Sequence, residues 1–422
     1  MKTIAKRAGR RRFLKDGATL AVLAVAGAGA IRSASGQTTG SEPSELRPKD
    51  TRTYGERSRF ETTSRLPDTP SANVTRAPLG DSLGIITASS LHMMRAHNNR
   101  APDIDPRQHR LLIHGMVDHP LIFNMDELKR FPSVSRIHFL ACAGNSYLSL
   151  DDRKNAKTVQ ETHGKTSCAE WTGVLLSVLL KEAGVQKGAS WIVGEGSEAM
   201  KWARSTPLVK AMDDAMVAYG QNGEALRPEQ GYPLRLIVPG FEGGFSPKWL
   251  RRIQVGEGPF MTRPETSRYV NHRPDGREQW FNPELEANSV ITRPSGGQQL
   301  PGRGFQEITG LAWSGAGAVR KVEVSTDGGK NWKDAQLQEP VLRFAHTRFR
   351  FPWNWDGEEA VLQSRCTDER GEVQASLAEL TKIWGVNREY WLSSPNAIQH
   401  INAIQPWKVT REGSVHNAIW EV

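Results

Sequence analysis

Residues 136–147, Arg-Ile-His-Phe-Leu-Ala-Cys-Ala-Gly-Asn-Ser-Tyr, restrict the fold of this chain most strongly. Apolar Ile137 and Phe139 alternate with polar neighbours and lead into Leu140, which is typical of a strand that enters a core. Small residues flank Cys142, and a Gly-Asn pair follows it. We therefore expect a thiol that is held rigidly at the end of a buried strand and is open to one side only.

Two interpretations of Cys142 follow from the residues alone. A thiolate is the soft ligand that a protein offers to a soft or high-valent metal. A cysteine is also a small apolar residue that is often buried, and it can be half of a disulfide. The pattern around Cys142 is compatible with both interpretations.

The first 36 residues have the pattern of a targeting peptide. Three arginines at 10–12 precede Phe13 and Leu14, and a weakly apolar run rich in alanine and glycine spans 17–31. This pattern resembles a twin-arginine signal, which exports folded proteins, often with a cofactor already bound. We predict a twin-arginine signal peptide over 1–36 and a periplasmic protein, with an ordinary secretory leader as the alternative.

The leader accounts for most of the positive charge of the chain. The 422 residues have a formal net charge of +9, and residues 1–36 contribute eight basic residues against one acidic residue. The remaining chain therefore has a net charge of only +2. We expect no nucleic-acid binding from this charge, and we expect no membrane span in the mature part.

Three cysteines, Cys142, Cys168 and Cys366, are an odd number for an exported protein. At least one thiol must then stay outside any disulfide. We interpret Cys168 and Cys366 as structural residues. The motif Cys-X-X-Cys-His does not occur, so we expect this chain to attach no c-type haem.

Two domains are expected, because 422 residues exceed the usual size of a single core. Residues 37–80 are largely polar with little periodicity, and we predict an extended arm or linker there. Residues 81–285 have the pattern of a mixed α/β domain. Strands are predicted at 111–113, 134–141, 191–193, 215–219, 234–238 and 249–255, helices at 125–130 and 173–183, and a tight turn at 222–223 between the strands 215–219 and 234–238.

Residues 286–422 change to an all-β pattern. Residues 319–325 alternate, Asp-Gly-Gly at 327–329 supplies a hairpin turn, and further strands are predicted at 342–351 and 360–366. The short spacing of these strands is typical of a β-sandwich. The predicted fold class is therefore α+β, a mixed α/β domain followed by a β-sandwich.

Four short stretches in the first domain place basic or polar groups beside glycine and proline turns. They are residues 92–98, 231–235, 246–249 and 267–269. Arginines and lysines that converge on one cleft would suit a phosphate or another oxyanion. We expect His92 and His97 to be structural and not metal ligands, since no second cluster completes a metal site.

Three longer runs carry a family resemblance. They are Cys-Ala-Gly-Asn at 142–145, Gly-Tyr-Pro-Leu-Arg to Lys-Trp-Leu-Arg-Arg across 231–252, and Ile-Thr-Gly-Leu-Ala-Trp-Ser-Gly to Val-Ser-Thr-Asp-Gly-Gly across 308–329. Jointly they resemble the sulfite oxidase family of molybdenum enzymes. Residues 103–115 and 221–233 are most similar to one exported branch, the molybdenum subunits of sulfane dehydrogenases of thiosulfate oxidation.

The resemblance implies a molybdopterin-binding catalytic domain over 81–285 and an immunoglobulin-like dimerisation domain over 286–422. It implies one molybdenum per chain on a single molybdopterin, and oxidation of sulfur by oxygen transfer from water. Cys142 would be the thiolate ligand of the metal. Arg95 and Tyr269 match active-site positions, and the residues that match cofactor-binding positions are His97, Asn98, Glu198, Arg235, Ser246 and Lys248.

The sequence departs from sulfite oxidases at three positions. Ser146 and Tyr147 stand where those enzymes have two arginines, and Gln230 stands where they have a cofactor-binding histidine. Each lost charge-assisted bond removes about 1.5–3 kcal/mol. We therefore expect weaker binding of a free sulfite dianion, and we predict a substrate of sulfane sulfur carried on the cysteine of a partner protein.

The resemblance also implies partners. With no haem or flavin expected in this chain, electrons would leave to a c-type cytochrome subunit, and the molybdenum subunit would form a dimer within a heterotetramer. One alternative is a sulfite dehydrogenase with the same cofactor and acceptor. Another is a non-catalytic exported binding protein in which Cys142 forms a disulfide.

Overall fold

The computed structural model describes residues 57–68, 71–97, 101–150, 157–267, 269–272, 275–280, 283–393 and 401–422. The chain divides into two units, Met1–Glu61 and Thr62–Val422, and the second unit holds all the helices and strands that are described. The predicted signal peptide at 1–36 lies outside the described residues, as does Asn98. Within the described ranges, no helix combines the length and the apolar character that a membrane crossing requires.

A small sheet forms within and beyond the stretch that we expected to be an arm. Strands β1 (Leu66–Asp68) and β2 (Ser71–Arg76) pair antiparallel, and β2 also pairs with β3 (Met94–Arg95). Val74 is the register partner of Arg95. The second half of the polar stretch thus gives Arg95 a fixed place on the edge strand of a sheet.

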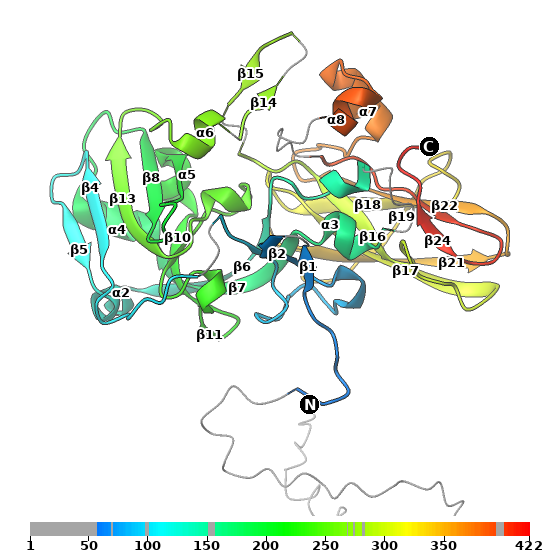
Figure 1. The fold of residues 1–422 in the computed structure, drawn as a ribbon, viewed down its shortest axis with the longest axis horizontal. Coiled ribbons are helices and arrows are strands. Elements are labelled where there is room, and N and C mark those ends of the chain that lie inside the picture. The colour runs from blue at the N-terminus through cyan, green and yellow to red at the C-terminus, as the bar shows by residue number, and fades with distance from the viewer. Residues whose placement is uncertain are drawn as a thin grey trace, which may run out of the picture. The chain divides into compact units, whose positions relative to one another are not determined.

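The mixed α/β part contains two five-stranded sheets (Figure 1). The first has the order β11-β10-β7-β6, with β12 also paired to β10, and the second has the order β5-β4-β13-β8-β9. The strands are β4 (Leu111–Gly115), β5 (Leu121–Phe123), β6 (Ser133–Ala141), β7 (Thr166–Leu175), β8 (Trp191–Gly196), β9 (Ala203–Pro207), β10 (Met216–Gln221), β11 (Glu224–Ala225), β12 (Arg235–Ile237) and β13 (Leu250–Gly256).

Short helices complete this part of the chain. Helix α4 has the apolar residues Leu176, Leu179 and Leu180, which share one buried core with β4, β8, β10 and β13 and so join the two sheets. The helices are α2 (Met125–Arg130), α3 (Val159–His163), α4 (Leu176–Ala183), α5 (Leu208–Asp213) and α6 (Arg263–Ser267), and a hairpin of β14 (Asn271–His272) and β15 (Glu278–Gln279) follows α6.

The predicted strands and helices of this part are confirmed, with two corrections. The helix predicted over 173–183 begins at Leu176, because Gly173 is still in the sheet as the register partner of Val134 and Ala218. The apolar run 173–183 fits a buried strand end as well as a helix, so periodicity could not place this boundary. The turn at 222–223 joins β10 to β11, and not β10 to β12.

The C-terminal part is the predicted β-sandwich. Its two sheets have the orders β16-β17-β21-β20 and β19-β18-β22-β23-β24. The predicted hairpin joins β18 to β19 across 327–329, whereas the strand predicted from 342 begins only at Thr347. The elements are β16 (Asn288–Arg293), β17 (Gly304–Trp313), β18 (Val319–Ser325), β19 (Lys333–Asp334), β20 (Gln336–Leu337), β21 (Thr347–Trp355), β22 (Ala360–Asp368), α7 (Leu377–Trp384), α8 (Arg388–Ser393), β23 (Trp407–Val409) and β24 (Val415–Asn417).

Strand β6 packs against both parts of the chain. It pairs with β7 over its whole length, and the N–H of Phe139 donates to the carbonyl of Phe344 at 2.7 Å. The Phe139 ring lies 6.4 Å from the Trp313 ring and 5.9 Å from the His346 ring, centroid to centroid. Both Phe139 and Trp313 are fully buried. The strand that ends at Cys142 is therefore fixed by the sheet on one side and by the sandwich on the other.

The close contact of β7 with β10 provides a test of this packing. A Cβ at Gly173 would lie 2.1 Å from the Val217 carbonyl oxygen and 2.6 Å from Ala218 Cα, and backbone atoms cannot move aside cheaply. We predict that Gly173→Ala lowers the free energy of unfolding by about 3 kcal/mol. Gly258→Ala is the matched control, since its Cβ would meet nothing within 4 Å. Urea unfolding of both variants measures the difference, and equal stabilities would contradict this packing.

Candidate active site

A pocket lies where β6 ends. Eight of the nine predicted site residues line it, and the ninth, Asn98, lies outside the described residues. The structure thus brings together positions between 95 and 269 of the sequence. The lining comprises Met93, Arg95, Ala96, His97, Cys142, Ala143, Glu198, Trp202, Gln230, Arg235, Gly243, Gly244, Ser246, Pro247, Lys248, Trp249 and Tyr269.

Cys142 is held by its backbone while its side chain stays partly exposed. Its N–H donates to the Lys165 carbonyl at 2.9 Å, and its own carbonyl accepts the N–H of Asn145 at 2.8 Å. The Asn145 side chain accepts the N–H of Lys165 at 3.0 Å and closes the turn. The thiol is therefore presented to the pocket from a turn with little freedom.

The other two cysteines are in a different environment. All three are free, so no disulfide forms, and Cys168 and Cys366 are fully buried in the apolar core. Burial raises the pKa of the Cys168 thiol to about 12 and raises the pKa of Cys366 as well. Neither can supply a thiolate at neutral pH, which supports their predicted structural role. Cys142 is the one cysteine that reaches a pocket lined by cations.

Arg235 and Lys248 bring positive charge into the pocket. Arg235 donates to the side-chain oxygen of Gln230 at 3.0 Å and to the carbonyl of Ser246 at 3.3 Å, and Lys248 donates to the carbonyl of Glu229 at 2.9 Å. Burial lowers the pKa of Arg235 to about 9, and burial together with the nearby Arg235 lowers that of Lys248 to about 7.

Neither of these cations forms an ion pair with a described residue, although the more distant charges of Glu198 and Glu229 act on Lys248. In the part of the chain that the structure describes, no carboxylate lies within 4.0 Å of Arg235 or Lys248. Burial is the first cause of both lowered pKa values, so holding two cations here without an ion-pair partner carries a cost in free energy. An anionic ligand such as a phosphate would remove it.

Glu198 adds to the pocket a buried carboxyl oxygen that has no hydrogen-bond partner among the described residues. Its Oε1 accepts the N–H of Trp202 at 2.9 Å, whereas its buried Oε2 has no hydrogen-bond partner among the described residues. A Cβ at Gly196 would lie 2.1 Å from this oxygen and 2.6 Å from the backbone carbonyl oxygen of Lys248, which cannot move aside cheaply, so glycine is required beside it. Burial raises the pKa of Glu198 above the ordinary value of a glutamate. A buried polar atom of this kind calls for a polar ligand.

Tyr269 forms the far wall of the pocket with two aromatic neighbours. Its hydroxyl lies 3.4 Å from His97 Nε2, and the His97 ring stacks on Trp202 at 3.7 Å between centroids. Trp202 Nε1 donates to the Gly244 carbonyl at 2.8 Å, which fixes the indole. Burial, and then the charges of Cys142 and Glu242, raise the pKa of Tyr269, so the phenol remains a hydrogen-bond donor.

The positions at which this chain departs from sulfite oxidases divide into two groups. Gln230 lines the pocket and orients Arg235, and its amide also donates to the Met93 carbonyl at 3.1 Å. Ser146 and Tyr147 do not line it, and Tyr147 packs beside a separate apolar cluster around Leu150. Side chains at 146 and 147 therefore add no charge to this pocket.

Sequence reasoning missed Trp202 and included His92 only as a structural residue. Trp202 follows a lysine in a loop without a recognisable motif, and only the fold places it against His97. His92 is fully buried, contacts the Met93 carbonyl through Nδ1 at 3.0 Å, and has a pKa lowered by burial to about 3. The described residues contain no cluster of three His, Cys, Asp or Glu side chains for a metal.

Comparisons with known proteins give this site a family. Residues 97–263 match the oxidoreductase molybdopterin binding domain, and residues 279–395 match the Mo-co oxidoreductase dimerisation domain. The crystal structure of the sulfane dehydrogenase SoxCD from Paracoccus pantotrophus is 38% identical, covers 90% of this chain and 95% of that chain, and superposes with a TM-score of 0.82. The chain belongs to the sulfite oxidase family of molybdenum enzymes.

The chain is also similar to nitrate reductases. The NADH nitrate reductase of Solanum lycopersicum is 34% identical over 64% of this chain, and that of Volvox carteri is 34% identical over 60%. The match spans about a third of the length of these curated relatives. The predicted family, the α+β fold class and the molybdopterin oxidoreductase class are confirmed.

The pocket fits the molybdenum-molybdopterin cofactor of the sulfite oxidase family. Among the described residues, a thiol, two cations without an ion-pair partner and a buried carboxyl oxygen without a hydrogen-bond partner meet there. The cofactor offers a metal, a phosphate and a polar pterin to them. The roles of the single residues remain predictions.

The buried charge of Lys248 predicts a pH dependence of the cofactor-free chain. The pKa of Lys248 falls from 10.5 to about 7 on folding, so above pH 7 the unfolded chain binds a proton that the folded chain lacks. Stability should therefore rise with pH above 7, and Lys248→Met should remove this rise. Urea unfolding at pH 7 and pH 9 measures the slope, with the exposed Lys181→Met as control. An unchanged slope in Lys248→Met would contradict the charge that we assign to the pocket.

Proposed function

We propose that this protein is the molybdenum subunit of a periplasmic sulfane dehydrogenase. It oxidises sulfane sulfur carried on the cysteine of a partner protein, with oxygen taken from water, and passes the electrons to a c-type cytochrome subunit. The observation that carries this proposal is the likeness to the SoxCD sulfane dehydrogenase along 90% of this chain and 95% of that one.

The charge of the pocket supports a carrier-bound substrate. Arg95, Arg235 and Lys248 line the pocket, and the last two are adjacent to the site proposed for the cofactor phosphate. Among the described residues that line the pocket, Arg95 is then the one cation left to attract an anionic substrate. A free sulfite dianion would gain few charge-assisted bonds here, whereas a substrate attached to a protein also gains binding energy from the docking of its carrier.

One set of pocket residues would hold the metal and the molybdopterin. Cys142 would hold the metal through its thiolate, and Arg235, Lys248, Ser246 and Glu198 would hold the molybdopterin. Molybdenum supplies, when bound, a centre that changes its oxidation state by two electrons, which no side chain can do.

Arg95, Tyr269 and His97 would act on the substrate and its protons. Arg95 is fixed by its strand and by a bond from Nη1 to the Ala96 carbonyl at 3.1 Å, so it can orient an oxyanion without a large loss of entropy. Tyr269 donates a hydrogen bond, and the His97 ring at 3.4 Å offers a path for a proton out of the pocket. We assign His97 to the cofactor-binding loop as well, together with Asn98.

The proposal also covers the export of the protein and its assembly with partners. A twin-arginine leader would deliver the folded protein, with its cofactor, to the periplasm. The match of residues 279–395 to a dimerisation domain supports a dimer of this subunit, and two cytochrome subunits would complete a heterotetramer.

The alternative with support from the same site is a sulfite dehydrogenase, and a substrate comparison separates the two. The holoenzyme is assayed with cytochrome c against a thiosulfate-loaded carrier protein and against sulfite. Arg95 is the one cation among the described pocket residues that the cofactor assignment leaves for an anionic substrate, so we predict a kcat/KM for sulfite about tenfold to a hundredfold below that for the carrier. Turnover of sulfite with a micromolar KM would contradict the sulfane assignment.

The role of Cys142 predicts a contrast among the three cysteines. Cys142→Ser should abolish turnover, because an alcohol replaces the thiolate, while thermal stability stays close to that of the wild type. Cys168→Ala and Cys366→Ala are controls for buried cysteines outside the pocket, and they should retain kcat although they lose stability. Activity and thermal melting of the three variants check this, and an active Cys142→Ser protein would exclude the role of ligand.

A further inference from the structure

Arg204 is a buried arginine behind the pocket wall. It lies on β9, its side chain is 3% exposed, and it is not among the residues that line the pocket. Burial of an arginine is costly, so a folded chain retains one where its charge or shape is used. Neither the sequence motifs nor the family resemblance assigns a role to this residue.

The guanidinium of Arg204 is held between two aromatic rings. Its Cζ lies 3.9 Å from the centroid of Phe245 and 4.5 Å from the centroid of Tyr269. A planar, weakly hydrated guanidinium stacks on aromatic faces, and such a contact is strengthened when it is desolvated. One face of the Tyr269 ring is therefore in contact with the buried guanidinium of Arg204.

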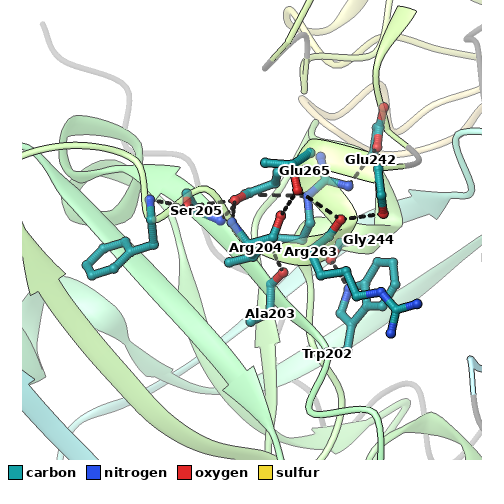
Figure 2. A network of polar contacts seen from close by, with 12 residues as sticks. Trp202, Ala203, Arg204, Ser205, Glu242, Gly244, Arg263 and Glu265 are labelled. Atoms are coloured by element: carbon teal, nitrogen blue, oxygen red, sulfur yellow. Dashed lines mark hydrogen bonds and ion pairs between the residues drawn. The ribbon is translucent and has the colours of Figure 1, made fainter.

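Two buried carboxylates balance the charge of Arg204. Its Nη1 lies 3.6 Å from Glu242 Oε2, and its Nε lies 3.6 Å from Glu265 Oε1. Figure 2 shows Arg204 between these two side chains. Neither nitrogen has a hydrogen-bond partner among the described residues, so charge and ring stacking together hold the guanidinium.

This balance distinguishes Arg204 from the cations that line the pocket. Arg235 and Lys248 have no carboxylate within ion-pair distance in the described part of the chain, whereas Arg204 has two. An arginine neutralised by two carboxylates adds little attraction for an anion. Its contribution is therefore to position other groups and not to bind the substrate.

The same contacts join the segments that carry the pocket wall. Glu265 belongs to α6 and accepts hydrogen bonds from the hydroxyl of Ser205 at 3.0 Å and from the N–H of Thr262 at 2.9 Å. The N–H of Tyr269 donates to the carbonyl of Pro264 at 3.0 Å, so the tyrosine is tied to the same helix. Arg204 thus links α6, and with it Tyr269, to β9.

We propose that Arg204 is a positioning residue that fixes the ring of Tyr269 and keeps its hydroxyl beside His97. This inference rests on the proposed role of Tyr269 in the reaction. Arg204 itself contacts neither substrate nor cofactor, and its effect passes through the tyrosine.

The test compares Arg204→Lys with Tyr269→Phe and with the double variant, each as the molybdenum-loaded protein. Lysine keeps the charge but loses the planar stacking. We expect kcat per bound molybdenum to fall tenfold to about a hundredfold in Arg204→Lys, with KM changed less than about twofold. The double variant should be no slower than Tyr269→Phe, because both substitutions remove the same contribution.

Arg348→Lys is the matched control, because Arg348 is also 3% exposed and lies on β21 of the sandwich with hydrogen bonds to Ser82 and Gly84. It should lose thermal stability while keeping kcat. Phe245→Leu removes the second ring of the stack without changing any charge, and it should lower kcat in the same direction as Arg204→Lys.

A second readout does not depend on turnover. In a crystal structure of Arg204→Lys, we expect the Tyr269 hydroxyl to move out of hydrogen-bond reach of His97 Nε2. All variants are assayed with sulfite and with the thiosulfate-loaded carrier in parallel, so a wrong substrate assignment leaves this test intact. A normal kcat in Arg204→Lys, a double variant slowed by the product of the two single effects, or an unmoved tyrosine would overturn the proposal.

Discussion

The anchoring of β6 from two sides is the constraint on which the rest of the site depends. The strand pairs with β7 in one sheet, and its Phe139 is enclosed by Trp313 and His346 of the sandwich. A reactive thiol needs a backbone that does not yield, since a metal–ligand bond is sensitive to small displacements. The two domains therefore do not merely adjoin the site: their shared core fixes the strand that ends at Cys142.

The buried cations near Cys142 are of two kinds, those without an ion-pair partner among the described residues and one that is paired with carboxylates. Arg235 and Lys248 have no carboxylate within ion-pair distance among the described residues, so we expect the pocket to be more stable when an anionic cofactor is bound. Arg204 has two carboxylates and serves the geometry of Tyr269. A buried cation without an ion-pair partner would thus bind the cofactor. A buried cation that is paired with carboxylates positions its neighbours.

Much of the fold could be predicted, because alternating strands and glycine turns have local signals. The hairpin at 327–329 and the strand 134–141 follow directly from such signals. The boundary at Leu176 could not be placed, since the apolar residues of 173–183 suit a strand end and a helix equally. The small sheet over β1 and β2 was missed because a polar stretch gains its order only from pairing with β3.

The residues of the candidate site could likewise be predicted only in part. Cys142, Arg95 and Tyr269 stand in motifs and could be identified from the family resemblance, and the fold places them around one pocket. Trp202, Arg204 and Phe245 have no motif, because their roles arise from contacts between β9, α6 and the segment 243–245 that are distant in the sequence.

The central claim is that the sulfur of Cys142 bonds to molybdenum. X-ray absorption at the molybdenum edge, with metal analysis of the wild type and of a Cys142→Ser variant, tests it most directly. The account predicts about one molybdenum per chain and the loss of one sulfur neighbour of the metal in the variant. A wild-type protein without molybdenum, or an identical sulfur shell in both proteins, would contradict it.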